Sequence, residues 1–248
     1  MTDKDPAAEE VRLHKLLAQS GVASRRKCEE LMLSGRVEVD GEIVTRLGVK
    51  VDPRRAVIRV DGERLPPVSD HVYYVLNKPA GVVSTMADPQ GRKCLGDMVG
   101  DLPQRLFHVG RLDTDTDGLI LLTNDGDFAQ AIAHPSYEIE KTYVAEVTGL
   151  ATKATIASLL AGVEVEGRVV DVRKARVRSQ VASRAIVELV IHEGRNRIVR
   201  RLLAQVGLPV RRLSRTRIGP VKLGNLRSGS LRELTAAEVG ALLDTAGL

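Results

Sequence analysis

An unbroken apolar run at residues 119–123, LILLT, restricts the possible fold more than any other feature of this sequence. A short run of this kind, with turn residues at both ends, is typical of a strand buried inside a sheet. The preceding segment, GRLDTDTDG, has aspartate at every second position, Asp113, Asp115 and Asp117, followed by Gly118. The run is followed by Asn-Asp-Gly, a turn signal. The sequence therefore predicts a buried strand that is entered through an acidic turn.

The first 65 residues predict a compact module of two short helices and small strands. Apolar residues at helical spacing indicate a helix from Val11 to about Gly21. Ser24 is a typical N-cap for a second helix, which stops at Gly35. Two Asp-Gly dipeptides flanked by alternating apolar and polar residues predict hairpins. The expected organisation is a disordered tail at 1–10, this module at 11–66, a linker at 67–71 and a second domain at 72–248.

The second domain mixes short strands with few helices. Strands are expected at its start, VYYVLNKPAGVV, and again at KTYVAEV and AIVELVI, with a short helix through residues 129–132. After EGRNR, five apolar residues fall on one face of a helix and arginines on the other, and Gly207 is a typical C-cap. Strands and helices do not alternate regularly. We therefore predict an α+β fold, with a small N-terminal α/β module and a second domain built on a mainly antiparallel mixed β-sheet flanked by helices.

The charge is unevenly distributed and indicates a polyanionic partner. The net charge of +5 conceals a block at residues 168–232 with 17 Lys and Arg against 3 Asp and Glu, a net +14. An arginine-rich surface without a partner would also give this pattern, but nucleic acid is the default partner for such a block. No apolar run is long enough to span a membrane, and Cys28 and Cys94 match no zinc spacing. We therefore expect a cytoplasmic protein with reduced thiols.

The acidic turn allows three interpretations. A calcium loop of the EF-hand type needs oxygen ligands at alternate positions and glycine at the sixth, which are present, but its twelfth position must be glutamate and here is Asn124. A clamp for another hard metal ion would need further ligands, and no second cluster of His, Asp or Glu is visible. The third interpretation is an aspartate-rich turn that is structural or presents one chosen carboxylate.

GRLDTDTDGLILLTNDG resembles the signature of the RsuA/RluB group of RNA pseudouridine synthases, GRLD-x-x-T-x-G-L-L-L-L-T-N-D-G, with Ile120 as the one conservative change. NKPAGVVST, KTYVAEV and EGRNRIVRRLLAQVG agree with the group in the same order. RLHKLLAQSGVASRRKCEELMLSGRVEVDG resembles an S4 RNA-binding domain, so the resemblance spans about residues 11–240. The form EGRNR-x-VRR is more similar to the RluB branch, which acts on 23S rRNA, than to the RsuA branch, which acts on 16S rRNA.

The resemblance implies isomerisation of uridine to pseudouridine in ribosomal RNA without a cofactor or metal. Asp113 corresponds to the catalytic aspartate, Arg200 to the basic side chain that pairs with it, and Tyr143 to the tyrosine that packs on the target base. The chemistry agrees, because the reaction gains and loses no atom and because a nearby cation keeps a buried carboxylate ionised. The alternatives are that Arg200 is a surface arginine and that Tyr143 is a cross-strand packing residue.

Further residues are expected to bind the RNA. Around the active site the resemblance implies substrate contacts from Arg111, Leu112, Lys78, Arg195, Asn196 and Arg197, with Lys78 a phosphate or structural contact. The predicted phosphate-binding residues are Arg12, Lys15, Arg25, Arg26, Lys27, Arg211, Arg212, Arg215 and Arg217. The expected partner is 23S rRNA or a large-subunit precursor, bound by a monomer that contacts no membrane. Two other functions remain open, a 16S rRNA synthase and a non-catalytic RNA-binding or ribosome-assembly protein.

Overall fold

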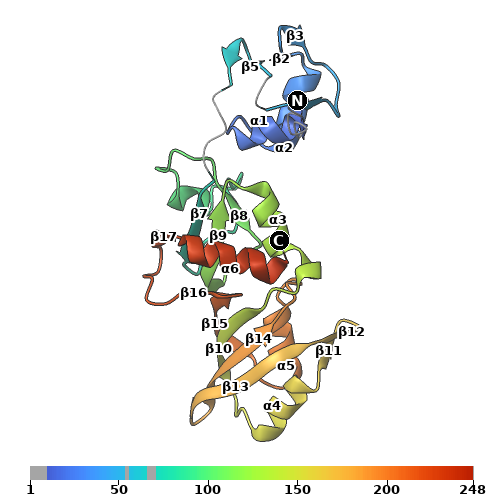
Figure 1. Cartoon of the computed structure of the whole chain (residues 1–248). Coiled ribbons are helices and arrows are strands. Elements are labelled where there is room, and N and C mark those ends of the chain that lie inside the picture. The colour runs from blue at the N-terminus through green and yellow to red at the C-terminus, as the bar shows by residue number, and fades with distance from the viewer. Residues whose placement is uncertain (1–9, 54–55, 66–70, 248) are drawn as a thin grey trace. The chain divides into compact units, whose positions relative to one another are not determined.

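The computed structural model describes residues 10–53, 56–65 and 71–247. The chain divides into two compact units, residues 1–71 and 72–248, and each is described by itself (Figure 1). The predicted tail at 1–10 and the predicted linker at 67–71 lie, except for residues 10 and 71, outside the described residues. Among the described helices, none is long and apolar enough to cross a membrane.

The first unit packs two helices beside small sheets. Its helices are α1 (Leu13–Gln19) and α2 (Arg25–Leu33), and its strands are β1 (Val11–Arg12), β2 (Val37–Val39), β3 (Glu42–Ile43), β4 (Lys50–Val51), β5 (Ile58–Val60) and β6 (Glu63–Arg64). One sheet has the order β3-β2-β5-β6. The chain enters as β1 rather than as the helix expected from Val11, because β1 pairs with β4. Leu13, Leu17, Cys28 and Met32 are fully buried between these elements.

The local signals of the first unit determine its turns. Both predicted hairpins form, with Asp40-Gly41 between β2 and β3 and Asp61-Gly62 between β5 and β6. In each pair both residues have positive φ, between +50° and +90°, the conformation that favours Asp-Gly in a two-residue hairpin turn. Ser24 caps α2 as predicted, since its side chain accepts a backbone N–H of the first turn at 3.3 Å.

The second unit is built on one nine-stranded sheet. Its strands are β7 (Tyr73–Lys78), β8 (Phe107–Val109), β9 (Thr116–Thr123), β10 (Lys141–Thr148), β13 (Val172–Val181), β14 (Arg184–Ile191), β15 (Val210–Ile218), β16 (Val221–Lys222) and β17 (Leu231–Glu233). Their order is β13-β14-β10-β15-β9-β7-β17, with β8 beside β9 and β16 beside β15. Every pair is antiparallel except β9 with β15, which is parallel. The predicted α+β fold with a mainly antiparallel mixed sheet is confirmed.

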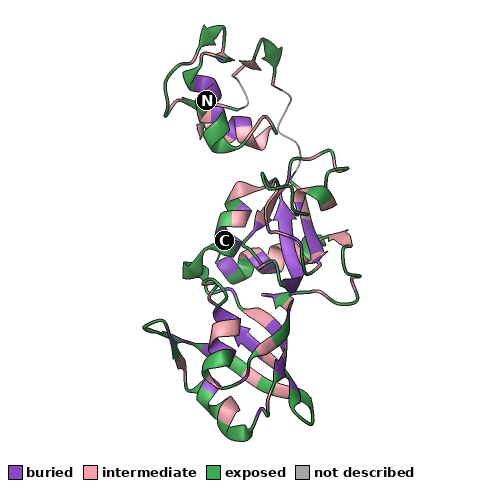
Figure 2. Cartoon of the chain, turned by 180° about the vertical axis from the view of Figure 1, so that it is seen from behind, coloured by how far each residue is buried: buried purple, intermediate pink, exposed green. Residues whose placement is uncertain are grey.

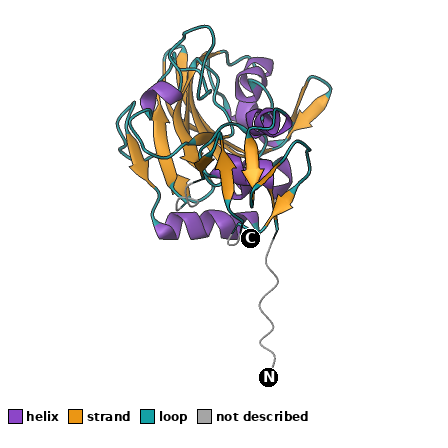
Figure 3. Ribbon diagram, turned by 90° about the horizontal axis from the view of Figure 1, so that it is seen from above, coloured by secondary structure: helices purple, strands orange, loops and turns teal. Residues whose placement is uncertain are grey.

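Helices and a small hairpin complete this unit. The helices are α3 (Gly126–Ala133), α4 (Lys153–Leu160), α5 (Ile198–Gln205) and α6 (Ala236–Ala246), shown with the strands and loops in Figure 3, and β11 (Val163–Val165) pairs with β12 (Arg168–Val170). Helix α3 starts at the predicted turn because Asp125 accepts two backbone N–H groups of its first turn. Helix α6 starts with a capping box between Thr235 and Glu238.

The unbroken apolar run forms strand β9, and its residues do not alternate between apolar and polar because both faces of this strand are covered. All eight of its residues are buried, and Figure 2 shows this buried strand in the interior of the second unit. Leu119 and Leu121 pack in one hydrophobic cluster with residues of α3 and α6. Ile120 and Leu122 pack in a second cluster with residues of α4 and α5. The central strand therefore sits between two cores, and the turn that leads into it is anchored on a rigid element.

One predicted strand is shorter than expected. The segment VYYVLNKPAGVV forms β7, which ends at Lys78. Pro79 has no N–H to donate to a neighbouring strand, so the chain continues as a loop. This loop returns to the acidic turn, as described below.

Candidate active site

A tight turn presents the side chain of Asp113. It joins β8 to β9, and the amide of Thr116 donates to the carbonyl oxygen of Asp113 at 3.0 Å. The hydroxyl of buried Ser84 donates to the carbonyl oxygen of Leu112 at 2.7 Å and accepts from the amide of Leu112 at 3.2 Å. The amide of Gly81, in the loop after β7, donates to the carbonyl of the residue after Asp113 at 2.7 Å. These bonds fix the backbone on both sides of Asp113, whose side chain is 28% exposed.

Gly118 allows two parallel strands to meet beside this turn. It lies opposite Arg215 where β9 pairs with β15. Its φ is +107°, and a Cβ atom would lie 2.3 Å from the carbonyl oxygen and 2.7 Å from the amide nitrogen of Arg215. Neither the conformation nor the space admits a side chain. Sheet packing, rather than a calcium loop, accounts for this glycine.

Each carboxylate of the turn lies beside an arginine from the basic block. Arg197 donates two hydrogen bonds to Asp115, at 3.0 and 2.8 Å, and its Nη1 lies 4.0 Å from Oδ2 of Asp113. Arg212 donates from Nε to Asp117 at 2.9 Å. The hydrogen bond from Arg197 is the largest cause that lowers the pKa of Asp115. Within the described part of the chain, no group of three or more His, Cys, Asp or Glu side chains is placed to hold a metal ion.

Arg200 contacts Asp115 rather than Asp113, contrary to the sequence-based expectation. Its Nη2 donates to the carbonyl oxygen of Asp115 at 2.8 Å, and its Nε lies 3.3 Å from Oδ2 of the same residue. The arginine that approaches Asp113 is Arg197, which directly precedes α5 with φ of +52°. A non-glycine residue in this conformation is unusual and is often found at a functional site. Arg200 is therefore connected to Asp113 only indirectly: it contacts Asp115, Asp115 binds Arg197, and Arg197 approaches Asp113.

A cavity of about 770 Å³ opens beside Asp113, a size suited to a small ligand. Its floor is formed by the central strands, with Thr116 from β9, Tyr143 from β10 and Arg215 from β15. Residues 109–113 and 192–199 form the sides, and the second segment includes the start of α5. The lining thus combines apolar side chains with polar and charged ones in about equal number.

Seven of the nine residues predicted around the active site line this cavity, and so does Arg215, one of the nine predicted phosphate-binding residues. Tyr143 is 7% exposed and lies between Leu189 of β14 and Arg215 of β15. Arg195 is held by Glu193, at 2.5 and 3.1 Å, and by a carbonyl oxygen of β11 at 3.3 Å, so it ties the β11–β12 hairpin to the cavity. The predicted residues found in the lining are Asp113, Tyr143, Arg111, Leu112, Arg195, Asn196, Arg197 and Arg215.

Two predicted RNA contacts are buried. Lys78 is fully buried, and its Nζ donates to the carbonyl oxygens of Pro79 at 3.0 Å and Val82 at 2.8 Å, so its contacts are structural and no phosphate reaches it here. Burial lowers the pKa of Lys78 to about 8, against the opposite effect of the turn's carboxylates. Arg215 is 3% exposed and donates from Nε to the carbonyl oxygen of Leu119 at 2.8 Å. It is not part of an exposed phosphate-binding surface, because it faces inward on β15, two residues after buried Leu213.

Comparison with known proteins agrees with this geometry. The family model described as RNA pseudouridylate synthase matches residues 72–205, and the S4 domain model matches residues 11–57. The chain belongs to the RNA pseudouridylate synthase family. An uncharacterized RNA pseudouridine synthase of Mycobacterium tuberculosis is 49% identical over 241 residues, which cover 96% of this chain and 95% of the relative.

Two further comparisons support the same assignment. The ribosomal large subunit pseudouridine synthase B of Bacillus subtilis is 45% identical over 233 residues, covering 93% of this chain and 95% of the relative. A crystal structure of pseudouridylate synthase is similar with a TM-score of 0.65 and 30% identity, covering 94% of this chain and 99% of that chain. The family and fold predicted from the sequence are confirmed.

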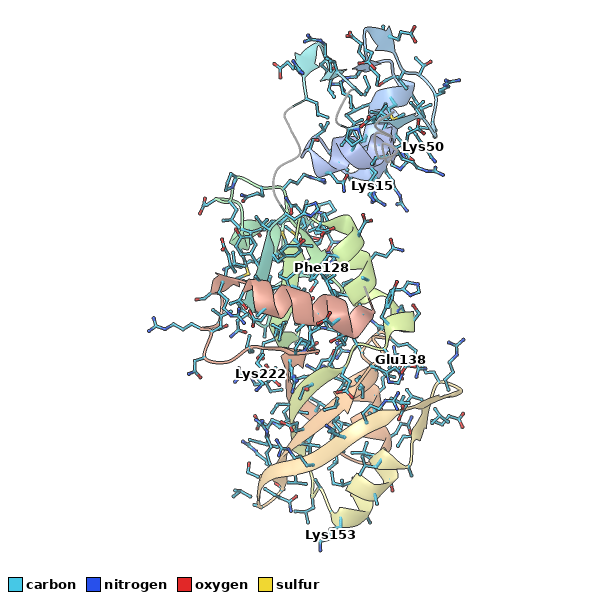
Figure 4. The ribbon with its side chains drawn as sticks, viewed as in Figure 1. Lys15, Lys50, Phe128, Glu138, Lys153 and Lys222 are labelled. Carbon is cyan, nitrogen blue, oxygen red and sulfur yellow. The ribbon has the colours of Figure 1, made fainter. Side chains whose placement is uncertain are left out.

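Other predicted RNA contacts of this pseudouridine synthase lie at the surface. Arg211, Arg212 and Arg217 are exposed in the second unit, and Arg12, Arg25, Arg26 and Lys27 are exposed in the first, where Lys15 is half-buried. Lys50, which was not predicted to bind RNA, is also exposed and lies opposite Arg12 in the β1–β4 pair (Figure 4). The first unit therefore carries basic side chains from α1, α2 and the β1–β4 pair.

Sequence reasoning also missed one polar residue of the synthase's cavity and one behind its acidic turn. Lys141 donates from Nζ to the carbonyl oxygens of Ile139 at 3.0 Å and His192 at 3.2 Å, and burial lowers its pKa to about 8. Ser84, which fixes the turn, was missed as well. Both residues lie inside segments, KTYVAEV and NKPAGVVST, that carried the family resemblance. The signal was available in the sequence, but only the fold shows what these side chains contact.

Proposed function

We propose that this synthase converts a specific uridine of large-subunit (23S) ribosomal RNA to pseudouridine. The observation that carries the proposal is the rigid turn that holds Asp113 at the wall of a nucleoside-sized cavity, with Arg197 at 4.0 Å. The choice of RNA is supported by relatives named ribosomal large subunit pseudouridine synthase B, from Bacillus subtilis and Haemophilus influenzae. The EGRNR-x-VRR form of the sequence favours the same branch.

The reaction breaks the C1′–N1 bond between ribose and uracil and forms a C1′–C5 bond. C5 loses a proton and N1 gains one, so the product is an isomer and no cofactor is consumed. Asp113 acts on the nucleoside beside this bond, as nucleophile or as base. Arg197, whose Nη1 lies 4.0 Å from Oδ2 of Asp113, places a positive charge beside this carboxylate in a partly buried site. Tyr143 packs against the base while it is detached.

Arg200 acts as a positioning residue in this proposal. Its Nη2 donates to the backbone carbonyl oxygen of Asp115 at 2.8 Å. The carboxylate of Asp115 in turn accepts hydrogen bonds from Nη1 and Nη2 of Arg197. The turn, Arg197 and the start of α5 are thereby kept in one arrangement. Loss of Arg200 is expected to lower the rate without removing a group that touches the base.

Recognition of the RNA requires that the target base leaves its stack. This step costs a few kcal/mol and is easiest in a loop or bulge. The exposed arginines of β15 and the basic residues of the first unit, residues 11–66, bind backbone phosphates, so affinity falls steeply with salt. We propose that the protein acts in the cytoplasm as a monomer, because a large asymmetric RNA offers no symmetric pair of sites.

The test uses unmodified 23S and 16S rRNA transcripts, incubated separately with the protein and with Asp113→Asn. Pseudouridine is mapped by carbodiimide labelling and primer extension. Asp101→Asn, an exposed aspartate away from the cavity lining, is the matched control. We expect one new stop on 23S rRNA with the wild type and the control, and none with Asp113→Asn.

Other outcomes would change the proposal in defined ways. A stop on 16S rRNA alone would keep the chemistry and reject the large-subunit substrate. A stop that persists with Asp113→Asn would reject the role of Asp113. If neither transcript nor ribosomal precursor particles are modified although both bind tightly, the non-catalytic RNA-binding alternative is favoured.

A further inference from the structure

The floor of the cavity carries polar atoms that have no partner within the protein. Buried side-chain nitrogen or oxygen atoms without a hydrogen bond are rare in folded proteins, and each calls for an explanation. Among the described residues, three such atoms belong to the cavity lining, Thr116 Oγ1, His192 Nδ1 and Arg215 Nη2. His192 Nδ1 has a carboxylate 3.9 Å away, so Arg215 and Thr116 are the clearer cases. Their place in one cavity indicates that a ligand completes them.

The side chain of Arg215 is held in a fixed orientation, and its buried Nη2 has no hydrogen-bond partner. Its Nε donates to the carbonyl oxygen of Leu119 at 2.8 Å, which ties the side chain to β9. Along the sheet it lies between Gly118 of β9 and Tyr143 of β10. The guanidinium is therefore preorganised on the strands that carry both the acidic turn and the tyrosine.

Lys141 adds a second positive charge on the same side of β10 as Tyr143, two residues away. Carbonyl oxygens of Ile139 and His192 take two of the three ammonium protons. Lys141 and Arg215 line the same cavity, and the charge of Arg215 contributes to the lowered pKa of Lys141. Burial of two like charges in one cavity is unfavourable unless a negative or acceptor group joins them.

The chemistry of these groups limits what the ligand can be. Guanidinium and ammonium groups only donate, so the ligand must present acceptor oxygens. A backbone phosphate is bonded to sugars on both sides and remains at the rim of a cavity. The edge of an extruded base, in contrast, is a free end that can reach a floor residue with 3% exposure. Uracil presents two carbonyl oxygens there, whereas cytosine carries an amino group in place of one of them.

We propose that Arg215, supported by Lys141, binds a carbonyl oxygen of the extruded uracil, selects uridine over cytidine, and stabilises the detached base. This inference rests on the proposed function. When the C1′–N1 bond breaks with its electron pair on nitrogen, the base carries a negative charge that is shared by its carbonyl oxygens. The charge disappears once C5 has bonded to C1′ and its proton has been transferred to N1. Fixed donors aimed at such a transient charge are a recognised source of rate acceleration.

The first arm of the test measures rate and affinity separately on an RNA hairpin that the wild type modifies. Arg215→Lys keeps the charge but removes the fixed fork, and Lys141→Met keeps the aliphatic stem. At saturating RNA we expect single-turnover rates to fall on the order of 10²-fold for Arg215→Lys and less for Lys141→Met. The dissociation constant should change by less than about threefold, and its salt dependence should keep the wild-type slope, since no phosphate contact is lost. Arg227→Met, an exposed arginine outside the cavity lining, is the control.

The second arm tests selectivity. Hairpins with cytidine at the target position compete with the uridine hairpin for binding, and Arg215→Lys should reduce the preference for uridine. Melting temperatures are compared to show that each variant is folded. A wild-type rate and preference in folded Arg215→Lys would overturn the inference, and so would a shallower salt slope with an unchanged rate, which is the signature of a phosphate contact. Failure of the wild type to modify either rRNA transcript or a precursor particle, from which the hairpin is chosen, would instead reject the proposed function.

Discussion

Replacing Gly118 by alanine is expected to disrupt the second unit more than any conservative change on its surface. The new Cβ would lie 2.3 Å from the carbonyl oxygen of Arg215, so β9 and β15 must separate by roughly 1 Å to restore ordinary contact. Such a shift lengthens the hydrogen bonds of the parallel pair beyond their normal range. It also displaces the turn that holds Asp113.

The magnitude follows from two contributions. Backbone strain at φ of +107° costs about 1–3 kcal/mol for a residue with a side chain. Weakening two hydrogen bonds of the pair costs about 1 kcal/mol each. The sum, about 3–5 kcal/mol, corresponds to a fall in melting temperature of roughly 6–20 °C for a unit of this size.

The assay exploits the distribution of tyrosine. The chain has no tryptophan, and its four tyrosines, Tyr73, Tyr74, Tyr137 and Tyr143, all lie in the second unit. Thermal unfolding followed by tyrosine fluorescence therefore reports on this unit without a contribution from the first. Modification of the RNA hairpin should be lost in parallel.

Gly91→Ala provides the matched control. Gly91 also has positive φ, +68°, but nothing lies within 4 Å of a Cβ built there. This variant carries backbone strain of about 1–3 kcal/mol without the steric clash, so its melting temperature should fall by about 2–12 °C and by less than that of Gly118→Ala. If Gly118→Ala melts within 2 °C of Gly91→Ala, the steric explanation of this glycine is wrong.

Three further predictions concern the turn and its surroundings. Ser84→Ala leaves the buried amide and carbonyl of Leu112 without their partner, and thermal melts should show a loss of about 1–3 kcal/mol together with a reduced modification rate; an unchanged rate would show that the hydroxyl does not position the turn. Asp115→Asn should cost less than about 1 kcal/mol, because that pair is half-exposed. Its single-turnover rate should nevertheless fall on the order of tenfold, because Arg197 loses its bidentate partner; equal effects on stability and rate would argue against a positioning role. The pKa of Lys78 is about 8 in the folded protein and 10.5 for an ordinary lysine side chain, so the unfolded state binds more protons between these values and the free energy of unfolding rises with pH in this window. Urea titrations followed by far-UV circular dichroism at pH 8 and 9.5 should show a smaller rise for Lys78→Met, and an equal rise would contradict the burial argument.

Local features of the fold could be predicted from the sequence because their causes are local. The apolar run became β9, the Asn-Asp-Gly signal became the start of α3, and the Asp-Gly hairpins formed. In these cases a few neighbouring residues determine the backbone, through burial or through a turn conformation. The family motifs also located the acidic turn and most of the cavity lining.

The parts that were missed depend on contacts between distant segments. No local pattern shows that β15 pairs with β9 in parallel, so the reason for Gly118 was not visible. Irregularities in the pairing of β15 with β10 interrupt the inward–outward alternation, so Arg215 is buried while its neighbours in the arginine-rich segment are exposed. Arg200 was assigned to Asp113 by motif, but the precise start of α5 determines which arginine reaches which carboxylate.

The residues that bond to the acidic turn and β9 lie far from them in the sequence, and this has a consequence for synthesis of the protein. The bonds from Arg197, Arg212 and Arg215 to the turn and β9 span 82, 95 and 96 positions of the chain. At a translation speed of about 5–20 residues per second, the GRLD turn waits roughly 5–20 s for these partners to be made. During that interval residues 116–118 of β9, which later pair with β15, lack a neighbour on that edge, although β8 already pairs with residues 121–123. This unpaired stretch is exposed to wrong pairing with other chains. A premature stop between β14 and β15 would therefore yield a protein that keeps the turn, Thr116 and Tyr143 but lacks Arg215 of the floor. A chaperone that shields the unpaired part of β9 would be most useful in this interval.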